Sequence, residues 1–321
     1  MALSIFAFSF TFALAMMLFL AVLVFRRARH ERAAPELAEA ERRVTRSYLQ
    51  RMSDARACRD VAAPTDVRLH AVAHLARLLR GAERDSLMAL AEGDGLLDAP
   101  IAALRSGRLK RRADAVQILE NFGTSRCVQA LTELMIAESD EGIQLEAASA
   151  LARLGKLPPP GALISLLKLH GKALNRVHLA LFRSLAPTHY AEIGELATRP
   201  RFTALRPMLV EALGWSSNRT AFDDLAPWST HPDAAVRQAA LMAAQHIGHH
   251  RAAAWVLTRL DDKDPAVRVT AVETVQKLGL VAALPIVRGM LHDPATWVAV
   301  HAERAVAALS TQQRPAPVQG G

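Results

Sequence analysis

The chain is poor in several residue types, and each shortage excludes a class of protein. It has two cysteines in 321 residues, Cys58 and Cys127, which excludes a disulfide framework and a multi-cysteine zinc or iron–sulfur site. Aromatic residues make up 5% of the chain, and the Val-, Ile- and aromatic-rich runs typical of sheets are scarce. Sixteen glycines and 16 prolines are too few for a collagen-like or disordered chain. The apolar residues are mainly alanine and leucine, which predicts a mostly helical protein.

The sequence also lacks the common catalytic motifs. It has no phosphate-binding loop, nucleophile elbow or metalloprotease His-Glu motif. His70 and His74 lie four residues apart on a predicted helix, but no third ligand is near, so an exposed helix face is favoured over a metal site. The acidic pairs at 223–224 and 261–262 lack calcium-loop spacing and are expected to be solvated. We therefore expect no metal, no cofactor and no small-molecule substrate.

Charge is absent from positions 1–25 and uneven after them. The formal net charge is +8, of which +6 falls in residues 26–80 and only +2 in residues 81–321. This distribution favours an anionic surface near residues 26–80. It argues against a nucleic-acid groove along the whole body, and no nucleic-acid partner is expected.

Residues 3–25 form an uninterrupted uncharged run. As a helix the run would span about 34 Å, which covers the hydrocarbon core of a bilayer. A cleaved signal peptide is the alternative, but no basic leader precedes the run and its apolar core is too long. We therefore expect residues 1–26 to be a transmembrane anchor that contacts lipid through residues 3–25. The predicted membrane-surface residues are Arg26, Arg27, Arg29 and Arg32.

Because these arginines flank only the C-terminal end of the run, the positive-inside rule places the N-terminus outside and the body in the cytoplasm. The expected location is thus the inner (cytoplasmic) membrane, crossed once. Residues 27–60 read as a basic helical connector with Leu37, Val44, Tyr48 and Met52 on one face. A stalk packed on the first repeat is favoured over an amphipathic helix resting on anionic headgroups.

The body from 61 to 311 shows an internal repeat with a period of 31 residues, the distance in sequence from Val236 to Val267. Asp264-Pro265 fits a helix start, since Asp can cap the helix and Pro suits its first position. Asp293-Pro294 repeats this signal, and Gly279 suits the left-handed residue that ends a helix. Two helices per repeat, stacked in series, predict an all-α solenoid of helical hairpins followed by a disordered tail at 312–321. The repeat is marked by Ile143, Leu174, Leu205, Val236, Val267 and Val298.

The pattern Asp-Pro-x-Val-Arg-x-x-Ala, followed by an apolar residue and Gly, resembles HEAT repeats of the membrane-anchored bacterial type. The resemblance is good over 220–310, fair over 109–219 and poor over 60–108. It implies that Asp264 and Arg268, and likewise Asp233 and Arg237, bond between adjacent repeats. Their recurrence favours this structural role over a catalytic Asp–Arg pair. The 174–205 repeat lacks the Asp, and its second helix is expected to stop at Pro187.

The resemblance implies a scaffold or adaptor without catalysis, which binds membrane-associated protein partners at the cytoplasmic face of the membrane. A basic cluster is a candidate partner-binding surface, although most such clusters are solvated faces. The four tryptophans are expected to be buried, and one exposed on the binding face would be a candidate hot spot. The basic cluster comprises Arg105, Arg108, Lys110, Arg111 and Arg112, and the tryptophans are Trp215, Trp228, Trp255 and Trp297.

A second function class stays open, because some HEAT-like proteins are bilin lyases and others are alkylpurine DNA glycosylases. A glycosylase needs a basic groove, which the small net charge of residues 81–321 does not favour. A lyase needs a pocket of convergent polar residues, which the sequence does not locate. A basic surface that binds nucleic acid is the remaining alternative, and it lacks interleaved aromatic residues for base stacking.

Overall fold

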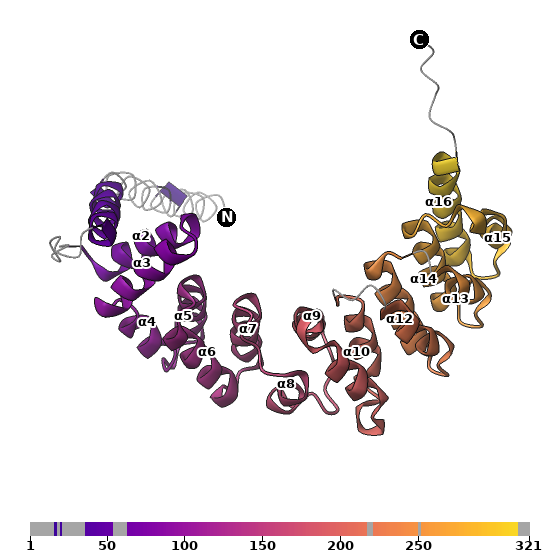
Figure 1. Ribbon diagram of the computed structural model, residues 1–321, viewed down its shortest axis with the longest axis horizontal. Coiled ribbons are helices and arrows are strands. Elements are labelled where there is room, and N and C mark those ends of the chain that lie inside the picture. Colours follow the sequence, from indigo (N-terminus) through magenta and orange to yellow (C-terminus); the bar gives the residue numbers. More distant parts are fainter. Residues whose placement is uncertain are drawn as a thin grey trace, which may run out of the picture. The chain divides into compact units, whose positions relative to one another are not determined.

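The computed structural model describes residues 16, 17, 20, 36–53, 63–216, 221–249 and 252–313. Within these residues the chain forms helices joined by turns and has no strand, so the predicted all-α repeat architecture is confirmed. The chain divides into two compact units, 1–130 and 131–321. Within each unit, Figure 1 shows the helices following one another in chain order.

The first unit consists of short antiparallel helices around a small apolar core. Its elements are the helix at 36–53, α2 (Thr65–Leu78), α3 (Ala82–Gly93), α4 (Asp98–Ala103) and α5 (Leu109–Phe122), and α6 (Ser125–Ala137) contains the boundary between the units. Helix α5 packs on both α2 and α4. The fully buried side chains of this core include Val72, Leu87, Leu97, Val116, Leu119 and Phe122.

The second unit alternates short helical segments with long helices. Its long helices are α7 (Glu141–Arg153), α9 (Arg176–Thr198), α12 (Ala234–Ile247), α14 (Pro265–Lys277) and α16 (Thr296–Gln313), with the shorter α10 (Arg206–Leu213) between α9 and α12. From α9 onward each of these packs on the next. The short segments are α8 (Pro160–Leu166), η1 (Pro200–Phe202), α11 (Ala221–Leu225), η2 (Ala226–Thr230), α13 (Ala253–Thr258), η4 (Arg259–Asp261), η5 (Val281–Ala283), α15 (Leu284–Gly289) and η6 (Met290–His292).

The predicted boundaries of α14 are confirmed, whereas α16 begins at Thr296, two residues after the Pro294 at which the sequence places its start. The Asp264 side chain accepts a hydrogen bond from Ala266 N at 2.8 Å, and Pro265 opens α14. Gly279 follows α14 with a φ of 62°, in the left-handed region that glycine adopts without strain. Apolar residues between such boundaries recur at helical spacing, and those of α12, α14 and α16 pack into one continuous core.

The helix that was expected to stop at Pro187 is interrupted just after it. Helix α9 consists of two helical segments on either side of a kink, where His189 has the non-helical values φ −123° and ψ 28°. Proline removes one backbone donor and clashes with the preceding turn, which kinks a helix. Apolar residues on both sides of the bend are buried, including Leu185 and Ile193, so packing keeps the two halves together.

Gly214 allows the backbones of two helices to touch. Its φ is −63°, so a left-handed backbone conformation is not what requires glycine here. A Cβ built on Gly214 would lie 2.4 Å from Ala243 Cα and 2.6 Å from Ala243 O. Only a residue without a Cβ fits here, so Gly214 sets the spacing between α10 and α12.

None of the described helices is both long and apolar enough to cross a bilayer. The predicted span at 3–25 lies outside the described residues apart from Met16, Met17 and Leu20, which are helical and exposed. Arg26, Arg27, Arg29 and Arg32 and the tail beyond residue 313 also lie outside the described part of the chain.

Candidate functional site

A groove crosses three helices of the second unit. It encloses about 390 Å³ at the N-terminal halves of α9, α10 and α12, a volume within the range of ligand sites. Its lining is mostly apolar and includes four polar residues, a composition suited to an amphipathic protein segment. The lining consists of Leu174, Asn175, Arg176, Leu179, Pro207, Met208, Glu211, Ala235, Gln238, Ala239 and Met242.

A half-exposed tryptophan lies next to this groove. Glu211 of the lining accepts an ion-paired hydrogen bond from Arg183 Nη2, and the Arg183 guanidinium lies 4.9 Å from the ring centre of Trp215. The His246 ring also packs on Trp215, with a centroid distance of 4.1 Å. The expectation of buried tryptophans is wrong, because Trp215 is 41% exposed, Trp297 is 50% exposed, and Trp228 and Trp255 are only partly buried.

His246 lies in the last turn of α12. Burial lowers the pKa of His246, and Lys277 and Arg183 lower it further. The ring is therefore held neutral at physiological pH and offers an aromatic face to Trp215. The Arg183 guanidinium, the Trp215 indole and the His246 imidazole thus form one cluster of rings and charge beside the groove, which we call the Trp215 cluster.

A buried polar cluster fastens the helix at 36–53 to the first unit. The Asp94 carboxylate accepts hydrogen bonds from Tyr48 Oη at 2.7 Å and from Arg51 Nη1 and Nη2 at 2.7 and 2.8 Å. Arg68 Nη2 lies 3.2 Å from the same carboxylate. Val44 and Tyr48 are fully buried, as the apolar face of the connector predicts, whereas Leu37 is exposed. We call Tyr48, Arg51, Arg68 and Asp94 the Asp94 clamp.

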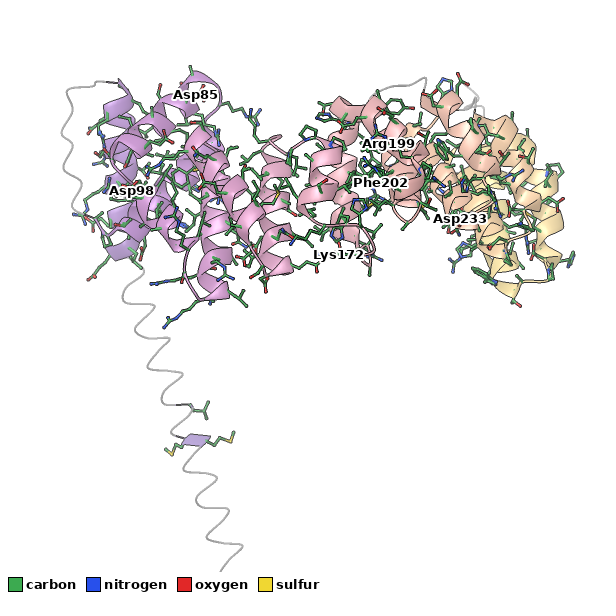
Figure 2. All side chains as sticks on the ribbon, turned by 90° about the horizontal axis from the view of Figure 1, so that it is seen from below. Asp85, Asp98, Lys172, Arg199, Phe202 and Asp233 are labelled. Carbon is green, nitrogen blue, oxygen red and sulfur yellow. The ribbon has the colours of Figure 1, made fainter. Side chains whose placement is uncertain are left out.

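Replacing Asp94 with alanine should detach the helix at 36–53. Hydrogen bonds from Arg51 lower the pKa of Asp94, so the carboxylate is charged in the folded protein, and its loss leaves a buried guanidinium unpaired. We expect a loss of about 2–4 kcal/mol in the stability of the docked helix. Faster hydrogen exchange across residues 36–53 would show it. Asp85→Ala, at an exposed acid of the same helix α3 (Figure 2), is the control, and equal exchange in the two variants would contradict the clamp.

The basic cluster of the sequence lies between α4 and the first turn of α5. Arg105, Arg108, Lys110 and Arg111 are exposed. Arg112 is half-buried and donates from Nη1 to Ser106 O at 2.8 Å. The cluster is thus a surface in the first unit, and the groove is in the second.

The two histidines of α2 do not assemble a metal site. His70 and His74 are both exposed, and His70 Nε2 lies 3.8 Å from Glu41 Oε1. Over the described residues no group of three or more His, Cys, Asp or Glu side chains could hold a metal ion.

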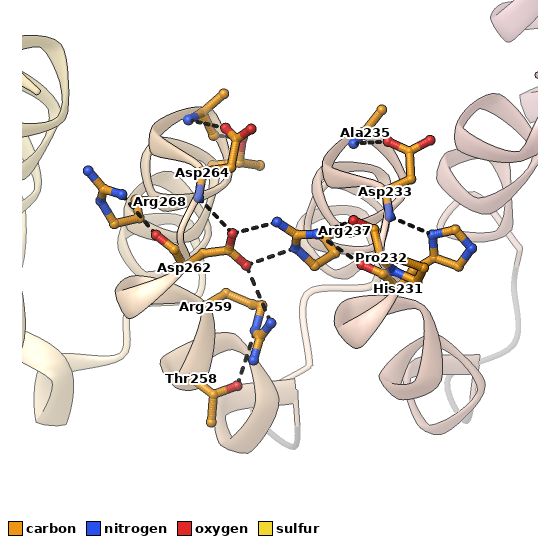
Figure 3. Close-up of polar contacts among 12 residues, drawn as sticks. His231, Pro232, Asp233, Ala235, Arg237, Thr258, Arg259, Asp262, Asp264 and Arg268 are labelled. Carbon is orange, nitrogen blue, oxygen red and sulfur yellow. Dashed lines mark hydrogen bonds and ion pairs between the residues drawn. The ribbon is translucent and has the colours of Figure 1, made fainter.

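Arginine–acid rungs join successive repeats of the second unit (Figure 3). Arg237 donates from Nε and Nη2 to the two carboxylate oxygens of Asp262 at 2.8 and 2.6 Å. Arg268 makes the same paired contact to Asp293 at 2.8 and 2.7 Å. Arg237 Nη1 also donates to His231 O, so one guanidinium ties together three segments.

The acid of each rung is not the one that the sequence pattern suggests. Asp233 and Asp264 each cap their own helix, by accepting from Ala235 N and Ala266 N. The rung acid is Asp262, two residues before the cap. Its side chain is 2% exposed, so the expectation of a solvated acid at 261–262 is wrong for this residue.

The rungs continue one repeat earlier with a different partner. Arg206 lies one repeat period before Arg237, and its Nη1 is 3.3 Å from His231 Nε2. His231 stands one period before Asp262, so the imidazole occupies the place of the rung acid. The register also aligns Asp293 with Asp262, and each of the two accepts a hydrogen bond from the backbone N–H two residues later, Ala295 N and Asp264 N. The three rungs recur at the same repeat period, and in each the arginine lies 25 residues before its partner in the sequence.

A family model of HEAT repeats matches residues 190–262 and again 228–309. Residues 190–309 are therefore similar to HEAT repeats. The match begins in the second half of α9, after the kink, and covers all three rungs. No curated protein matches the chain.

Several solved structures are similar to the chain at low identity. Human deoxyhypusine hydroxylase in complex with glycerol is 15% identical over 87% of this chain and 99% of its own, with a TM-score of 0.33. A designed armadillo repeat protein is 18% identical over 82% and 98%, with a TM-score of 0.24. A structure that concerns the structural basis of microtubule plus end tracking by XMAP215, CLIP-170 and EB1 is 14% identical. The match covers 68% of this chain and 92% of that chain, with a TM-score of 0.30. Likenesses of this size assign no activity and no partner.

The groove lies partly on these HEAT repeats and partly before them. Met208, Gln238 and Met242 belong to the matched region, whereas Arg176 and Leu179 precede it. Sequence reasoning missed the groove because its lining is ordinary for helix surfaces. The rung acid could have been found from sequence, because Asp262 and Asp293 are one repeat period apart.

Proposed function

We propose that this chain is a single-pass membrane-anchored scaffold that binds a protein partner through its HEAT repeats and catalyses no reaction itself. The observation that supports it most directly is the groove across α9, α10 and α12, with an exposed tryptophan beside it. Stacked helical repeats offer extended surfaces of this kind to protein segments, and exposed tryptophans are enriched among residues that dominate binding.

The anchored part of the proposal is supported by the sequence. The uncharged run at 3–25 and the arginines that follow it favour a span with the body on the cytoplasmic side of the inner membrane. A tether restricts the groove to the bilayer and raises its effective concentration toward membrane-associated partners. No nucleic acid or small-molecule substrate enters the proposal.

Replacing Trp215 with alanine should weaken partner binding at least tenfold. A hot-spot residue contributes about 2 kcal/mol or more to binding, which corresponds to roughly thirtyfold in affinity. Full-length protein is cross-linked in membranes and solubilised, and partners are quantified by mass spectrometry for wild type and Trp215→Ala. Recovery of a defined partner should fall in the variant.

The matched control is Trp297→Ala in α16. Trp297 is 50% exposed, yet it lies outside the groove lining and the Trp215 cluster. Binding should survive this change if the groove carries the contact. An equal loss of partner recovery in both variants would contradict a binding site beside α10. Unchanged recovery in both variants would contradict it as well. Recovery of no partner by wild type would count against the scaffold itself.

A further inference from the structure

The first unit carries a surface of positive side chains that the described part of the chain leaves without acidic partners. We define the basic patch as Arg105, Arg108, Leu109, Lys110 and Arg111. Among the described residues, none of its four cationic side chains makes an ion pair. The sequence has no Asp or Glu between positions 98 and 114. Asp98 itself (Figure 2) is already paired with Arg126 Nη1 at 2.7 Å.

The patch is placed where positive charge destabilises the fold. Lys110 and Arg111 lie in the first turn of α5, a helix of 14 residues with no acid in that turn and no side-chain cap. The N-terminal end of a helix is its positive end, so cations there are unfavourable. A local arrangement that opposes folding is expected where function requires it. An anionic surface from outside the protein would relieve the repulsion.

An apolar side chain stands in the middle of these charges. Leu109 is 52% exposed and is flanked by Arg108 and Lys110. Cationic residues around an exposed leucine suit the bilayer interface, where the charges meet headgroups and the apolar group enters the acyl boundary. An acidic protein surface would satisfy the charges but would leave the leucine without a partner.

The chain length keeps this unit close to the bilayer. The Asp94 clamp fixes the helix at 36–53 to the unit, and only residues 26–35 separate that helix from the end of the predicted span. A stretch of this length reaches at most about 35 Å when fully extended. The unit that carries the patch is therefore held at the membrane surface.

We propose that the basic patch binds the headgroups of anionic phospholipids, with Leu109 entering the interface. This inference rests on the membrane anchor of the proposed function, and it adds a second contact between the first unit and the bilayer. The patch holds the unit against the bilayer, whereas the anchor only tethers it.

Hydrogen exchange of the full chain in nanodiscs tests this contact. The first N–H groups of α5 have no acceptor within the helix, so they exchange readily unless a surface covers them. Exchange across 105–112 should be several-fold slower in discs that contain phosphatidylglycerol than in pure phosphatidylcholine discs. High salt should remove the difference, because it screens exposed charges.

The variant Lys110→Glu/Arg111→Glu should abolish the lipid dependence. It should also raise the melting temperature of the first unit by a few degrees, since acids in the first turn suit the helix dipole. Loss of protection with gain of stability separates lost binding from misfolding. The control is Lys263→Glu/Arg288→Glu, which makes the same charge change at exposed sites of the second unit and should keep the lipid dependence.

The outcomes separate the patch from the anchor. A chain that enters the discs but shows equal exchange in both lipids overturns the patch and leaves the anchor standing. A chain that does not enter the discs overturns the anchor, and free vesicles of the same two compositions then test the patch alone. If the wild-type chain sediments with anionic vesicles and the double variant does not, the patch is supported. If the wild-type chain does not sediment with them, the patch is overturned.

Discussion

Replacing Asp262 with alanine should lower the free energy of unfolding by about 3–5 kcal/mol, the cost of breaking a buried ion pair by removing one partner. The side chains of Arg237 and Asp262 are 4% and 2% exposed, so solvent cannot replace the lost carboxylate. The guanidinium would keep its bonds to His231 O and Pro232 O but would lose its counter-charge. Chemical denaturation of wild type and variant measures the difference.

Asp264→Ala is the comparison that identifies the rung acid. Asp264 only caps α14, and removal of such a cap costs about 1 kcal/mol. A further variant, Arg237→Met/Asp262→Leu, removes both charges and should recover most of the loss, since apolar replacement of a buried pair is often neutral. A larger loss at Asp264 than at Asp262 would contradict the assignment.

The same rung predicts a response to acid. Burial raises the pKa of Asp262, but the hydrogen bonds from Arg237 and from Asp264 N outweigh it, so the pKa is lowered overall. Its contribution to stability is therefore complete above the unfolded pKa of about 3.9 and is lost as pH falls through the folded pKa. The stability difference between wild type and Asp262→Ala should shrink below about pH 4.

Replacing Gly214 with alanine should destabilise the second unit by about 1–3 kcal/mol or more, because the new methyl group overlaps backbone atoms. The nearest atoms belong to the Ala243 main chain, which cannot rotate away as a side chain would. Relief requires α10 and α12 to separate, and this disturbs the packing that both helices make with their neighbours. The midpoint of thermal or denaturant unfolding reports the loss.

Gly194→Ala is the matched control in the neighbouring helix α9. No atom lies within 4 Å of a Cβ built on Gly194. Alanine in a helix interior is favoured over glycine by about 0.5–1 kcal/mol, so this variant should be slightly more stable than wild type. If both variants changed the stability in the same direction, the close approach of Ala243 to Gly214 would not explain the effect of Gly214→Ala.

The helical repeats could be predicted from sequence because their boundaries depend on local chemistry. Asp264, Pro265 and Gly279 each act within one turn of a helix, and their roles are visible without knowledge of neighbours. The break after Pro187 could be predicted from the proline, but the second helical segment directly behind it could not, since burial of residues after the bend decides it. The role of Gly214 as a spacer depends on the packing of α12, which the sequence does not show.

The candidate site was less predictable for the same reason. The groove joins residues from three helices that are separated by many positions in the chain, and none of them forms a motif. From the sequence alone, Trp215 cannot be told apart from the other three tryptophans. Only the packing shows which of them are exposed and which are partly buried. The basic patch was visible as a cluster, but its conflict with the dipole of α5 depends on where that helix begins.

The Asp94 clamp makes the N-terminal connection of the body a rigid mount. A flexible linker would let the body turn freely, whereas the clamp fastens the helix at 36–53 to the first unit and leaves the length of the stretch 26–35 to set the reach to the predicted span. Insertions in that stretch would lengthen the reach and leave the docking of the mount unchanged. Insertions between residue 36 and the clamp would instead rotate the preceding part of the chain about the axis of the helix at 36–53, relative to the first unit. The rotation would be about 100° for each added residue.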